Sequence, residues 1–524
     1  MRTSIKLLAL LLAMVMTCSV LLACSSGGGD TSGDASSAGT PSGNTSGTPV
    51  GPDSPYAELP EGLRFDGDGE KPEIRFIVAD DIGAGYNLAG RSIDVDDTED
   101  AADTVNVTIL QRNKIVEDTL GVDIVLLDTV GLMSMASTIQ PSLLGGSDDY
   151  DVVGAYQYYA PGLVLGDNAG FMLNYNTLVE EDNFLNFNKP YWNGELFNEM
   201  SYKGAGYFVT GDLSLSYVGG MYVTFVNARI WDLYKDFIKE ETGYETVYDV
   251  VTNYKWTLDF MTKLVDKVWV DENHNDKPDK GDQVGFMVLS GDSNVGLDGM
   301  YAGCNLRYTK WVDGEPTLGV NNERTYDIAE KLYRLYFESK AMNDSDSDKY
   351  IMEDFADGNC LFVVNRLYTS ELYLRDMADD YIICPCPMLN EEQHHYYSTL
   401  HDGFTLFAIP YTNSKLPATT ATLELMASES YRLVTPAYYE IALKTKYTRG
   451  DVNQAGAMID IVHDNVYTDF VALYTERLGG VTMVFRTGLN KRFASTVRSH
   501  EKVWSRGVQN LLDALTESIA IDLR

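Results

Sequence analysis

The sequence predicts an α/β protein whose folded part is too long for a single hydrophobic core. Strand-like and helix-like segments alternate between residues 74 and 154, which favours a parallel sheet with helices on its faces. The last third of the chain is mainly helical in its pattern. About 455 residues follow the N-terminal leader and linker, a length that indicates two or more lobes.

The alternating segments have clear boundaries. The predicted strands are 74–78, 122–127 and 151–154. Asp103 is placed to cap the first helix, Gly121 ends it, and Pro141 interrupts a second helix over 133–144. Since ligands of such sheets lie beyond the carboxyl ends of the strands, Tyr156, just after the third strand, is expected near a binding site.

Three amphipathic helices are predicted in the C-terminal third. Their apolar stripes are expected to face the core. The first includes Ile328 and Leu332, the second Leu423 and Met426 with an end near Pro436, and the third runs from Val508 to Ile519.

The N-terminus has the pattern of an export signal. Arg2 and Lys6 precede an apolar run over 7–22, which is too short for a membrane span and typical of a signal peptide. The run ends at Ala23 and Cys24, as lipoprotein signals do. This resemblance implies that residues 1–23 are removed and that the sulfur of Cys24 carries a lipid. The alternative is an ordinary secretory signal with an incidental cysteine.

Residues 24–70 are predicted to form the lipid anchor and a flexible tether. The segment from residue 25 to about 57 consists of Gly, Ser, Thr, Asp and Pro, which cannot bury enough apolar surface to offset the entropy of ordering. The sequence therefore describes a body held at the extracytoplasmic face of a cell membrane.

Charge and cysteine content exclude several classes of function. The net charge of -37 argues against nucleic acid as a partner, because the phosphate backbone would be repelled. Cys304, Cys360, Cys384 and Cys386 are too scattered for a disulfide framework, so free buried thiols are favoured over a bridge such as Cys304 to Cys360.

Sequence signatures of common enzymes are missing. The chain contains no GxSxG, HExxH or Gly-Lys dipeptide, so the usual esterase, zinc-protease and P-loop patterns are absent. His394, His395 and His401 lie near Asp402, but their spacing matches no metal-ligand pattern, and surface histidines in a loop are the favoured interpretation.

The segment 271–282 (DENHNDKPDKGD) resembles a calcium-binding EF-hand loop. Oxygen ligands at positions 1, 3, 5, 7, 9 and 12 can surround a hard dication. They would come from Asp271, Asn273, Asn275, the Lys277 carbonyl, Asp279 and Asp282. Position 6 is Asp276 in place of the usual glycine, so a solvated acidic turn is the alternative, and any bound calcium is expected to be structural.

Five further segments carry a family resemblance. They are 149–153 (DYDVV), 224–227 (TFVN) followed by 255–259 (KWTLD), 355–362 (FADGNCLF) and 383–387 (ICPCP). In this order and spacing they resemble segments of the extracellular solute-binding proteins of carbohydrate ABC transporters. The resemblance covers the chain from residue 71 onward.

The resemblance implies a two-lobed periplasmic-binding-protein-like (Venus flytrap) fold that closes on its ligand about a hinge. The chain would cross between lobes near Gly211, Pro387 and Pro436. Lobe 1 would comprise 71–210 and 388–435, and lobe 2 would comprise 211–387 and 436–524.

The resemblance implies that the protein is a monomer that captures a solute without enzymatic activity and delivers it to the permease subunits of an importer. An oligosaccharide is the solute that the family favours. A secreted glycoside hydrolase or lyase and a surface glycan-binding adhesin are the alternatives. Expected ligand-binding residues are Tyr156 after the third strand, Asp212 after the first crossing, Asn365 and Arg366 after the strand 361–364, Tyr397 and Asp402 after the return crossing, and Trp192 as an aromatic platform or a core residue.

Overall fold

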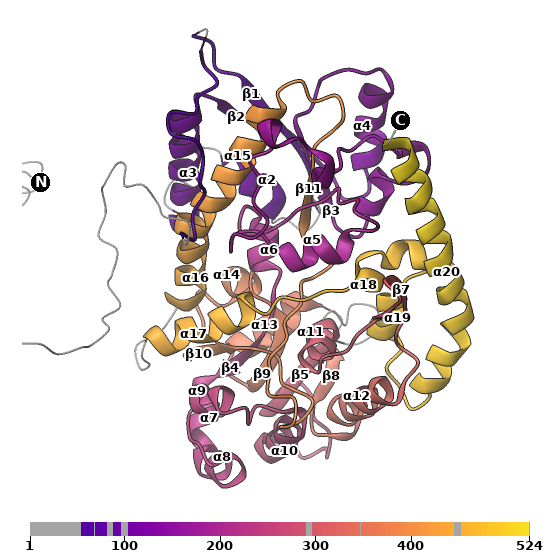
Figure 1. The fold of residues 1–524 in the computed structure, drawn as a ribbon. Coiled ribbons are helices and arrows are strands. Elements are labelled where there is room, and N and C mark those ends of the chain that lie inside the picture. Colours follow the sequence, from indigo (N-terminus) through magenta and orange to yellow (C-terminus); the bar gives the residue numbers. More distant parts are fainter. Residues whose placement is uncertain are drawn as a thin grey trace, which may run out of the picture. The chain divides into compact units, whose positions relative to one another are not determined.

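Two separate β-sheets, each flanked by helices, organise the body of the protein (Figure 1). The computed structural model describes residues 54–67, 69–80, 87–95, 103–289, 296–345, 347–444 and 452–522. Each sheet with its helices is one lobe, and the arrangement confirms the predicted α/β, two-lobed fold class.

The first sheet has the strand order β11-β3-β1-β2. Its strands β1 (Glu73–Asp80), β2 (Asp123–Gly131) and β3 (Val152–Tyr156) are parallel, and β11 (Thr405–Ala408) pairs antiparallel with β3. The three predicted strands are confirmed. The helices of this lobe are α2 (Leu88–Ile93), α3 (Thr104–Leu120), α4 (Met135–Leu144), α5 (Gly194–Met200), α6 (Leu215–Gly219) and α15 (Leu416–Glu429).

Local signals set the ends of α3 as the sequence predicts. The Asp103 carboxylate accepts hydrogen bonds from the backbone N–H groups of Val105 and Asn106 at the start of the helix. Gly121 ends the helix with a φ of 66°, a left-handed conformation that costs glycine little. Pro141 lies inside α4 without ending it.

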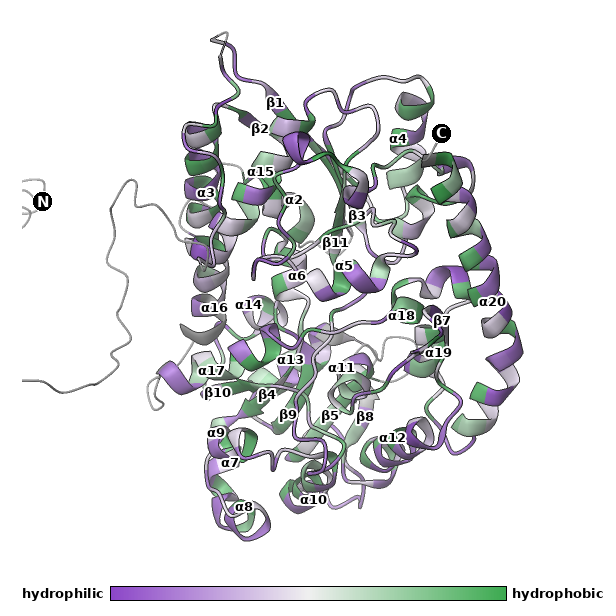
Figure 2. Ribbon diagram, in the orientation of Figure 1, coloured by the Kyte–Doolittle hydropathy of each residue, from purple (hydrophilic) through white to green (hydrophobic). Residues whose placement is uncertain are grey.

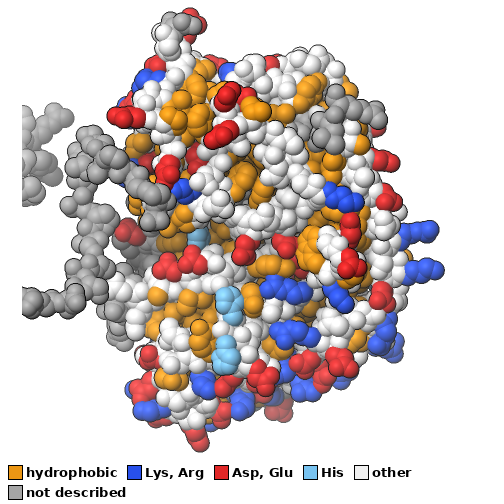
Figure 3. Space-filling view, viewed as in Figure 1, with side chains coloured by type: hydrophobic (Ala, Val, Ile, Leu, Met, Phe, Trp, Pro, Cys, Tyr) orange, Lys and Arg blue, Asp and Glu red, His pale blue; other side chains and the backbone are white. Residues whose placement is uncertain are grey.

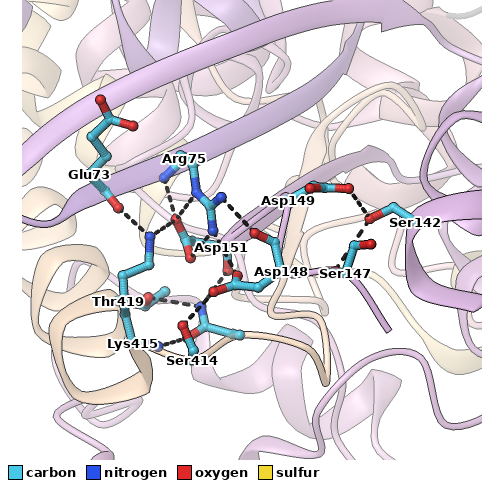
Figure 4. Close-up of polar contacts among 11 residues, drawn as sticks. Glu73, Arg75, Ser142, Ser147, Asp148, Asp149, Asp151, Ser414, Lys415 and Thr419 are labelled. Atoms are coloured by element: carbon cyan, nitrogen blue, oxygen red, sulfur yellow. Dashed lines mark hydrogen bonds and ion pairs between the residues drawn. The ribbon is translucent and has the colours of Figure 1, made fainter. Parts of the chain in front are cut away.

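A buried ion-pair network fixes the amino ends of β1 and β3 (Figure 4). The Asp151 side chain is fully buried, and its Oδ2 accepts hydrogen bonds from Arg75 Nε at 2.9 Å and Lys415 Nζ at 2.8 Å. Arg75 also reaches Asp148 Oδ1 at 2.7 Å. The network joins two strands to the segment that precedes α15, at the edge of the sheet opposite to the strands' carboxyl ends.

The second sheet has the strand order β10-β4-β9-β5-β8. β4 (Tyr222–Asn227) pairs antiparallel with β10 (Tyr381–Cys384) and β9 (Cys360–Arg366), whereas β5 (Val284–Leu289) pairs parallel with β9 and β8 (Met342–Ser345). β4, β5 and β9 are buried along their whole length, as expected for strands covered on both faces. The surrounding helices are α7 (Ala228–Leu233), α8 (Lys235–Thr242), α9 (Val247–Thr252), α10 (Leu258–Val268), α11 (Gly296–Gly303), α12 (Glu323–Tyr333), α13 (Asp348–Ala356) and α14 (Thr369–Tyr373).

The chain connects the two sheets three times, through 157–221, through 385–404 and through a long helical run that follows β11. In this run α15 continues through a π-helical turn, Ser430–Val434, into α16 (Thr435–Lys444). The predicted helix end near Pro436 is therefore wrong. Pro436 lies in the first turn of α16, where a missing N–H is tolerated, and the preceding wide turn lets Thr435 N–H bond to Ser430 O.

The C-terminal part is helical, as predicted. It comprises α17 (Val452–His463), α18 (Phe470–Leu473), α19 (Val481–Thr487) and the 30-residue α20 (Phe493–Asp522), next to a hairpin of β6 (Thr309–Val312) and β7 (Glu315–Leu318). Figure 2 shows hydrophobic and hydrophilic residues interleaved along α20, whose buried positions include Val497, Trp504 and Leu511. Ser518 Oγ donates to Val164 O at 2.6 Å and attaches this helix to the first lobe.

The packing shortens the predicted tether. The segment 54–67 packs on the first lobe, with Ala57 N–H donating to Ser428 Oγ at 2.9 Å and Phe65 N–H to Leu120 O at 2.8 Å. Its apolar side chains, Leu59 and Leu63 among them, lie against the core, so a tether extending to residue 70 is too long.

The four cysteines of the body are buried free thiols, as expected, and the alternative bridge from Cys304 to Cys360 is not formed. Burial raises the pKa of the Cys386 thiol to about 12. Among the described helices, none combines the length and the apolar content that a membrane crossing requires.

Candidate functional site

A cavity of about 340 Å³ lies between the two lobes. Its size falls within the range of about 300–1,000 Å³ that is typical of small-molecule sites. Both lobes and two of their connections supply the lining residues, which are Asp80, Leu88, Tyr156, Ser216, Gly220, Ser347, Lys349, Arg366, Tyr368, Thr369, Leu372, Tyr373, His401, Gly403 and Phe404.

The first lobe contributes the carboxyl ends of two parallel strands. Asp80 ends β1, and its Oδ2 accepts a hydrogen bond from Ala89 N–H, in the first turn of α2, at 2.8 Å. Tyr156 ends β3 and is half-buried, with its ring 6.2 Å from the ring of Tyr159. This is the edge at which an α/β sheet normally presents its ligand site.

The second lobe contributes a cation and several tyrosines. Arg366 ends β9 and is 6 % exposed. Its Nε donates to Asn365 Oδ1 at 3.3 Å, and its guanidinium lies 4.9 Å from the centre of the Tyr368 ring. Tyr373 comes from α14 and Lys349 from α13, so flat rings and hydrogen-bond donors face the cavity from this side.

A charged cluster lies beside the cavity, on the connection that precedes β11. Gly403 N–H donates to His401 Nδ1 at 3.1 Å, which assigns the ring proton to Nε2, 3.5 Å from Asp402 Oδ1. Burial lowers the pKa of His401 to about 3. The Asp402 carboxylate acts to raise this pKa, and the positive charges of Arg366 and Arg486 act to lower it. His401 is therefore a neutral donor at neutral pH.

Arg486, from α19, pairs with two carboxylates at once. Its Nη2 bonds to Asp402 Oδ2 at 3.0 Å and to Asp298 Oδ2. Burial opposes ionisation of Asp402, but His401 and Arg486 hold its pKa below the usual value. Burial raises the pKa of Asp298, whose other oxygen is buried without a hydrogen-bond partner.

Asp298, Asp402 and Arg486 also line a second, smaller cavity of about 60 Å³. Phe404 lines both cavities, so the two spaces adjoin across this side chain. Tyr308, Tyr467 and Gln157 complete much of the wall, and Gln157 Nε2 donates to Leu473 O at 2.6 Å between the lobes. An unpaired carboxylate oxygen at such a place can accept a hydroxyl donor.

Tyr156 and Arg366 are the two expected ligand-binding residues that line the larger cavity, and Asp402 lines the smaller one. Asn365 is fully buried in β9 and holds Arg366. Tyr397 lies apart from both, 4.8 Å from the guanidinium of Arg307 and 4.4 Å from the ring of His395.

For Trp192 the core alternative holds, and one expectation about the cleft, that for Asp212, is corrected. Trp192 is 4 % exposed in the core of the first lobe, and its Nε1 donates to the buried carboxylate Glu424 at 2.8 Å. Asp212 is 2 % exposed and accepts a hydrogen bond from Thr435 Oγ1 at 2.7 Å. His463 Nε2 lies 3.4 Å from the same Asp212 oxygen, so this carboxylate joins two of the connections between the lobes and does not line either cavity.

Sequence reasoning missed several residues that line the larger cavity. Asp80 ends a predicted strand and could have been found by the argument that selected Tyr156. His401 was interpreted as a surface histidine, like His394 and His395, but it lies in the cavity wall because residue 401 pairs with Gly220 of another connection. Tyr368 and Tyr373 carried no local signal.

The calcium-like loop lies in the second lobe, between α10 and β5. Asp279 accepts hydrogen bonds from Asn273 Nδ2 at 2.7 Å and Asn275 Nδ2 at 2.5 Å, while Asp271 accepts from the backbone N–H groups of residues 275 and 276. Asp282 is buried and accepts from Glu272 N–H and Trp269 Nε1. Lys277 N–H donates to Asn275 Oδ1 at 2.8 Å.

The side chains at positions 1, 3, 5, 9 and 12 thus gather around one loop, as a bound dication requires. His274 and Asp276 have φ values of 60° and 61°, so the turn is made without the glycine of the usual pattern. No group of three or more His, Cys, Asp or Glu side chains with metal-binding geometry occurs in the described part of the chain. The residues therefore fit calcium only in part, and calcium binding stays a prediction. Cys24 lies outside the described residues.

Comparison with known proteins identifies the fold. No protein-family model matches the chain, and no curated protein sequence matches it. A solved extracellular solute-binding protein from Staphylococcus aureus in complex with maltose matches 84 % of this chain and 99 % of its own, with a TM-score of 0.52 at 12 % identity.

Two further solved structures give the same result. An ABC substrate-binding protein from Listeria monocytogenes in complex with cycloalternan covers 85 % of this chain and 100 % of its own, with a TM-score of 0.50 at 12 % identity. A cyclic alpha-maltosyl-1,6-maltose binding protein from Arthrobacter globiformis covers 84 % and 100 %, with a TM-score of 0.50 at 10 % identity. The chain thus has the two-lobed fold of these carbohydrate-binding ABC-transporter proteins.

Proposed function

We propose that the protein is the extracytoplasmic solute-binding component of an ABC importer and that it captures a sugar between its lobes. The carrying observation is the interlobe cavity, to which Asp80 and Tyr156 contribute from one sheet and Arg366 from the other. Because the two sides come from different lobes, a bound solute would contact both and favour the closed arrangement.

The chemistry of the lining suits a sugar. Sugars present apolar C–H faces and a rim of hydroxyl groups, and Tyr156, Tyr368 and Tyr373 offer flat rings together with polar tips. Arg366 and the neutral His401 add hydrogen-bond donors. The sugars bound by the neighbouring structures favour an oligosaccharide as the solute.

Binding without hydrolysis is favoured over a glycoside hydrolase. Most glycosidases place two carboxyl groups about 5–9.5 Å apart on either side of the scissile bond. Among the described residues that line the larger cavity, Asp80 is the one carboxylate, and it already accepts the hydrogen bond of a helix N–H group.

A panel of maltose, maltotetraose, cycloalternan and other oligosaccharides tests the proposal by thermal shift. A solute that binds the folded state raises the melting temperature by mass action, and a binding protein returns it intact in a chromatogram. Cleavage of the sugar would establish the hydrolase or lyase alternative. An unchanged melting temperature with every oligosaccharide of the panel would contradict the proposal.

We further propose that Cys24 carries the lipid that holds the protein at the membrane, next to the permease subunits. The apolar run before Cys24 and the linker after it support this proposal. Cys24→Ala is expected to leave the body folded but to move the protein from the detergent phase to the aqueous phase on partitioning. A variant that stays in the detergent phase would contradict the lipid anchor.

A further inference from the structure

A groove of about 320 Å³ on the second lobe is lined by three cationic side chains and by no carboxylate. It lies where α11 is followed by β6, beside the start of α12. The lining residues are Asn305, Leu306, Arg307, Thr309, Lys310, Gly319, Asn322, Arg324, Thr325 and Ile328. Figure 3 shows Lys and Arg side chains gathered on this face, near the positions of β7 and α12 in Figure 1.

Two of the three cations are held by an aromatic ring or by a backbone carbonyl. The Arg307 guanidinium lies 3.4 Å from the centre of the Tyr467 ring, and Arg324 Nη2 donates to Cys304 O at 2.9 Å. Lys310 is exposed on β6. Within the described part of the chain, none of the three forms an ion pair with an Asp or Glu side chain.

The charge balance of the groove is opposite to that of the whole chain. The net charge is -37, with 77 acidic residues against 40 Lys and Arg, yet no carboxylate lines the groove. A second groove of about 340 Å³ is the contrast, because its Lys255 and Lys263 pair with Glu391 and Glu241, each at 2.6 Å. The groove at Arg307 is of similar size, but its lining contains cations and no carboxylate.

The nearby carboxylates lie outside the lining of the groove. Burial and Asp469 raise the pKa of Glu199, and the positive charge of Arg307 offsets part of this effect. Asp469, below Thr309, lines the neighbouring small cavity and accepts hydrogen bonds from Thr309 and from the backbone N–H of Tyr308. Glu323 and Asp327 stand on α12, but neither lines the groove. The N-terminus of α12 adds a favourable field for an anion.

We propose that this groove is a second ligand site, separate from the interlobe cavity, that binds a phosphate or sulfate group. Two arginines and a lysine around one space are the side chains that recognise such oxyanions, since guanidinium groups form charge-assisted, often bidentate hydrogen bonds. The group would be carried by a free ester or by a polymer at the cell surface. Its recognition needs no residue of the interlobe cavity.

Calorimetric titration of the folded protein at low ionic strength tests the proposal, with inorganic phosphate and inorganic sulfate as probes. Saturable binding of either anion at one site per chain is expected, weakened by added sodium chloride. The anion that binds more tightly shows whether the natural ligand carries a phosphate or a sulfate ester. A sugar phosphate and a sulfated oligosaccharide then distinguish a free ester from a polymer. Absence of heat with both inorganic anions would overturn the proposal.

Variants separate the site from the charge of the whole molecule. Lys310→Gln with Arg324→Gln changes two exposed side chains and is expected to weaken anion binding at least tenfold. The control, Lys255→Gln with Lys263→Gln, changes the net charge equally in the other groove and is expected to bind like wild type. Equal losses in both pairs would overturn the proposal. Sugar binding is expected to survive in both, whether or not the anion binds.

Discussion

Single residues at the lobe interface divide into those that can contact a solute and those that hold the lobes. Tyr156 and Arg366 end strands of different sheets and line one cavity. Asp212, selected because it follows a predicted lobe crossing, and Trp192, selected as an aromatic platform or a core residue, are buried and bonded to protein groups. Strand ends could be located from the sequence, but burial depends on which other segment packs over them, and this is a property of the whole fold.

Tyr156→Ala is expected to weaken sugar binding by about 1–3 kcal/mol, because the variant loses a flat ring that can stack on the sugar. Tyr156→Phe should retain most of the affinity if the ring, rather than the hydroxyl, makes the contact. Calorimetry with the sugar found by the panel measures both. Tyr333→Ala, on α12 and outside the cavity, is the control and should bind like wild type. Equal affinities for all three variants would remove Tyr156 from the site.

His401 and His463 are expected to shift the pH dependence of stability in opposite directions. Burial lowers the pKa of His401 to about 3, so between pH 3 and 6.5 the unfolded chain binds the extra proton and stability falls as the pH falls. Burial alone would lower the pKa of His463, but Asp212 and Asp464 raise it to about 10, so its contribution is complete below pH 6.5 and is lost as the pH rises toward 10.

Denaturant unfolding from pH 4 to pH 9.5 measures both effects. His401→Gln should flatten the acid side by up to about 1.4 kcal/mol per pH unit, the slope for one proton. His463→Gln should flatten the alkaline side and leave the acid side unchanged. If both variants keep the wild-type slope on both sides, the environments assigned to these two rings are wrong.

At the scale of elements, the first sheet depends on the buried carboxylate between β1 and β3. Removing one partner of a buried ion pair costs about 3–5 kcal/mol, because the remaining charges stay buried. Asp151→Ala should therefore lower the free energy of unfolding by up to about this amount, since Lys415 loses its carboxylate partner and Arg75, which is partly exposed, keeps only Asp148. The neighbouring Asp149 is exposed and accepts one hydrogen bond from Ser142. Chemical denaturation of Asp149→Ala should show a change within about 0.5 kcal/mol, and a similar loss in both variants would contradict the assignment.

The loop 271–282 is the element whose chemistry most needs a test. If calcium binds there, it stabilises the folded state by mass action, and a chelator should lower the melting temperature. Asp271→Ala removes position 1 and should abolish this response, whereas Asp276→Ala, at a position that supplies no ligand, should keep it. A wild-type melting temperature that is indifferent to chelator and to added calcium would show that the loop is only a hydrogen-bonded turn.

At the scale of the molecule, the order of elements could be predicted further than their packing. Asp103, Gly121 and the apolar runs determine local conformation, so β1, α3, β2 and β3 are recognisable in the sequence. The continuation of α15 through the π-helical turn into α16 could not be predicted, because a proline inside a helical pattern usually ends the helix. Here Pro436 lies in the first turn of α16, directly after the π-helical turn, and is tolerated. Cavity residues such as Tyr368 and His401 could not be predicted either, because backbone contacts with the distant residues Gly219 and Gly220 place them in the wall.

The central claim is that a solute closes the two lobes around the interlobe cavity. Leu144 on α4 and Leu233 on α7 are exposed, one in each lobe, so cysteines introduced there can carry spin labels. The four native thiols of the body are buried, and Cys24→Ser removes the cysteine of the proposed anchor. Double electron–electron resonance then measures the distance between the two spin labels, with and without the sugar that raises the melting temperature. The account predicts a single shorter distance at saturation, reached at a higher sugar concentration in Tyr156→Ala. An unchanged distance with the sugar bound at full occupancy would contradict it.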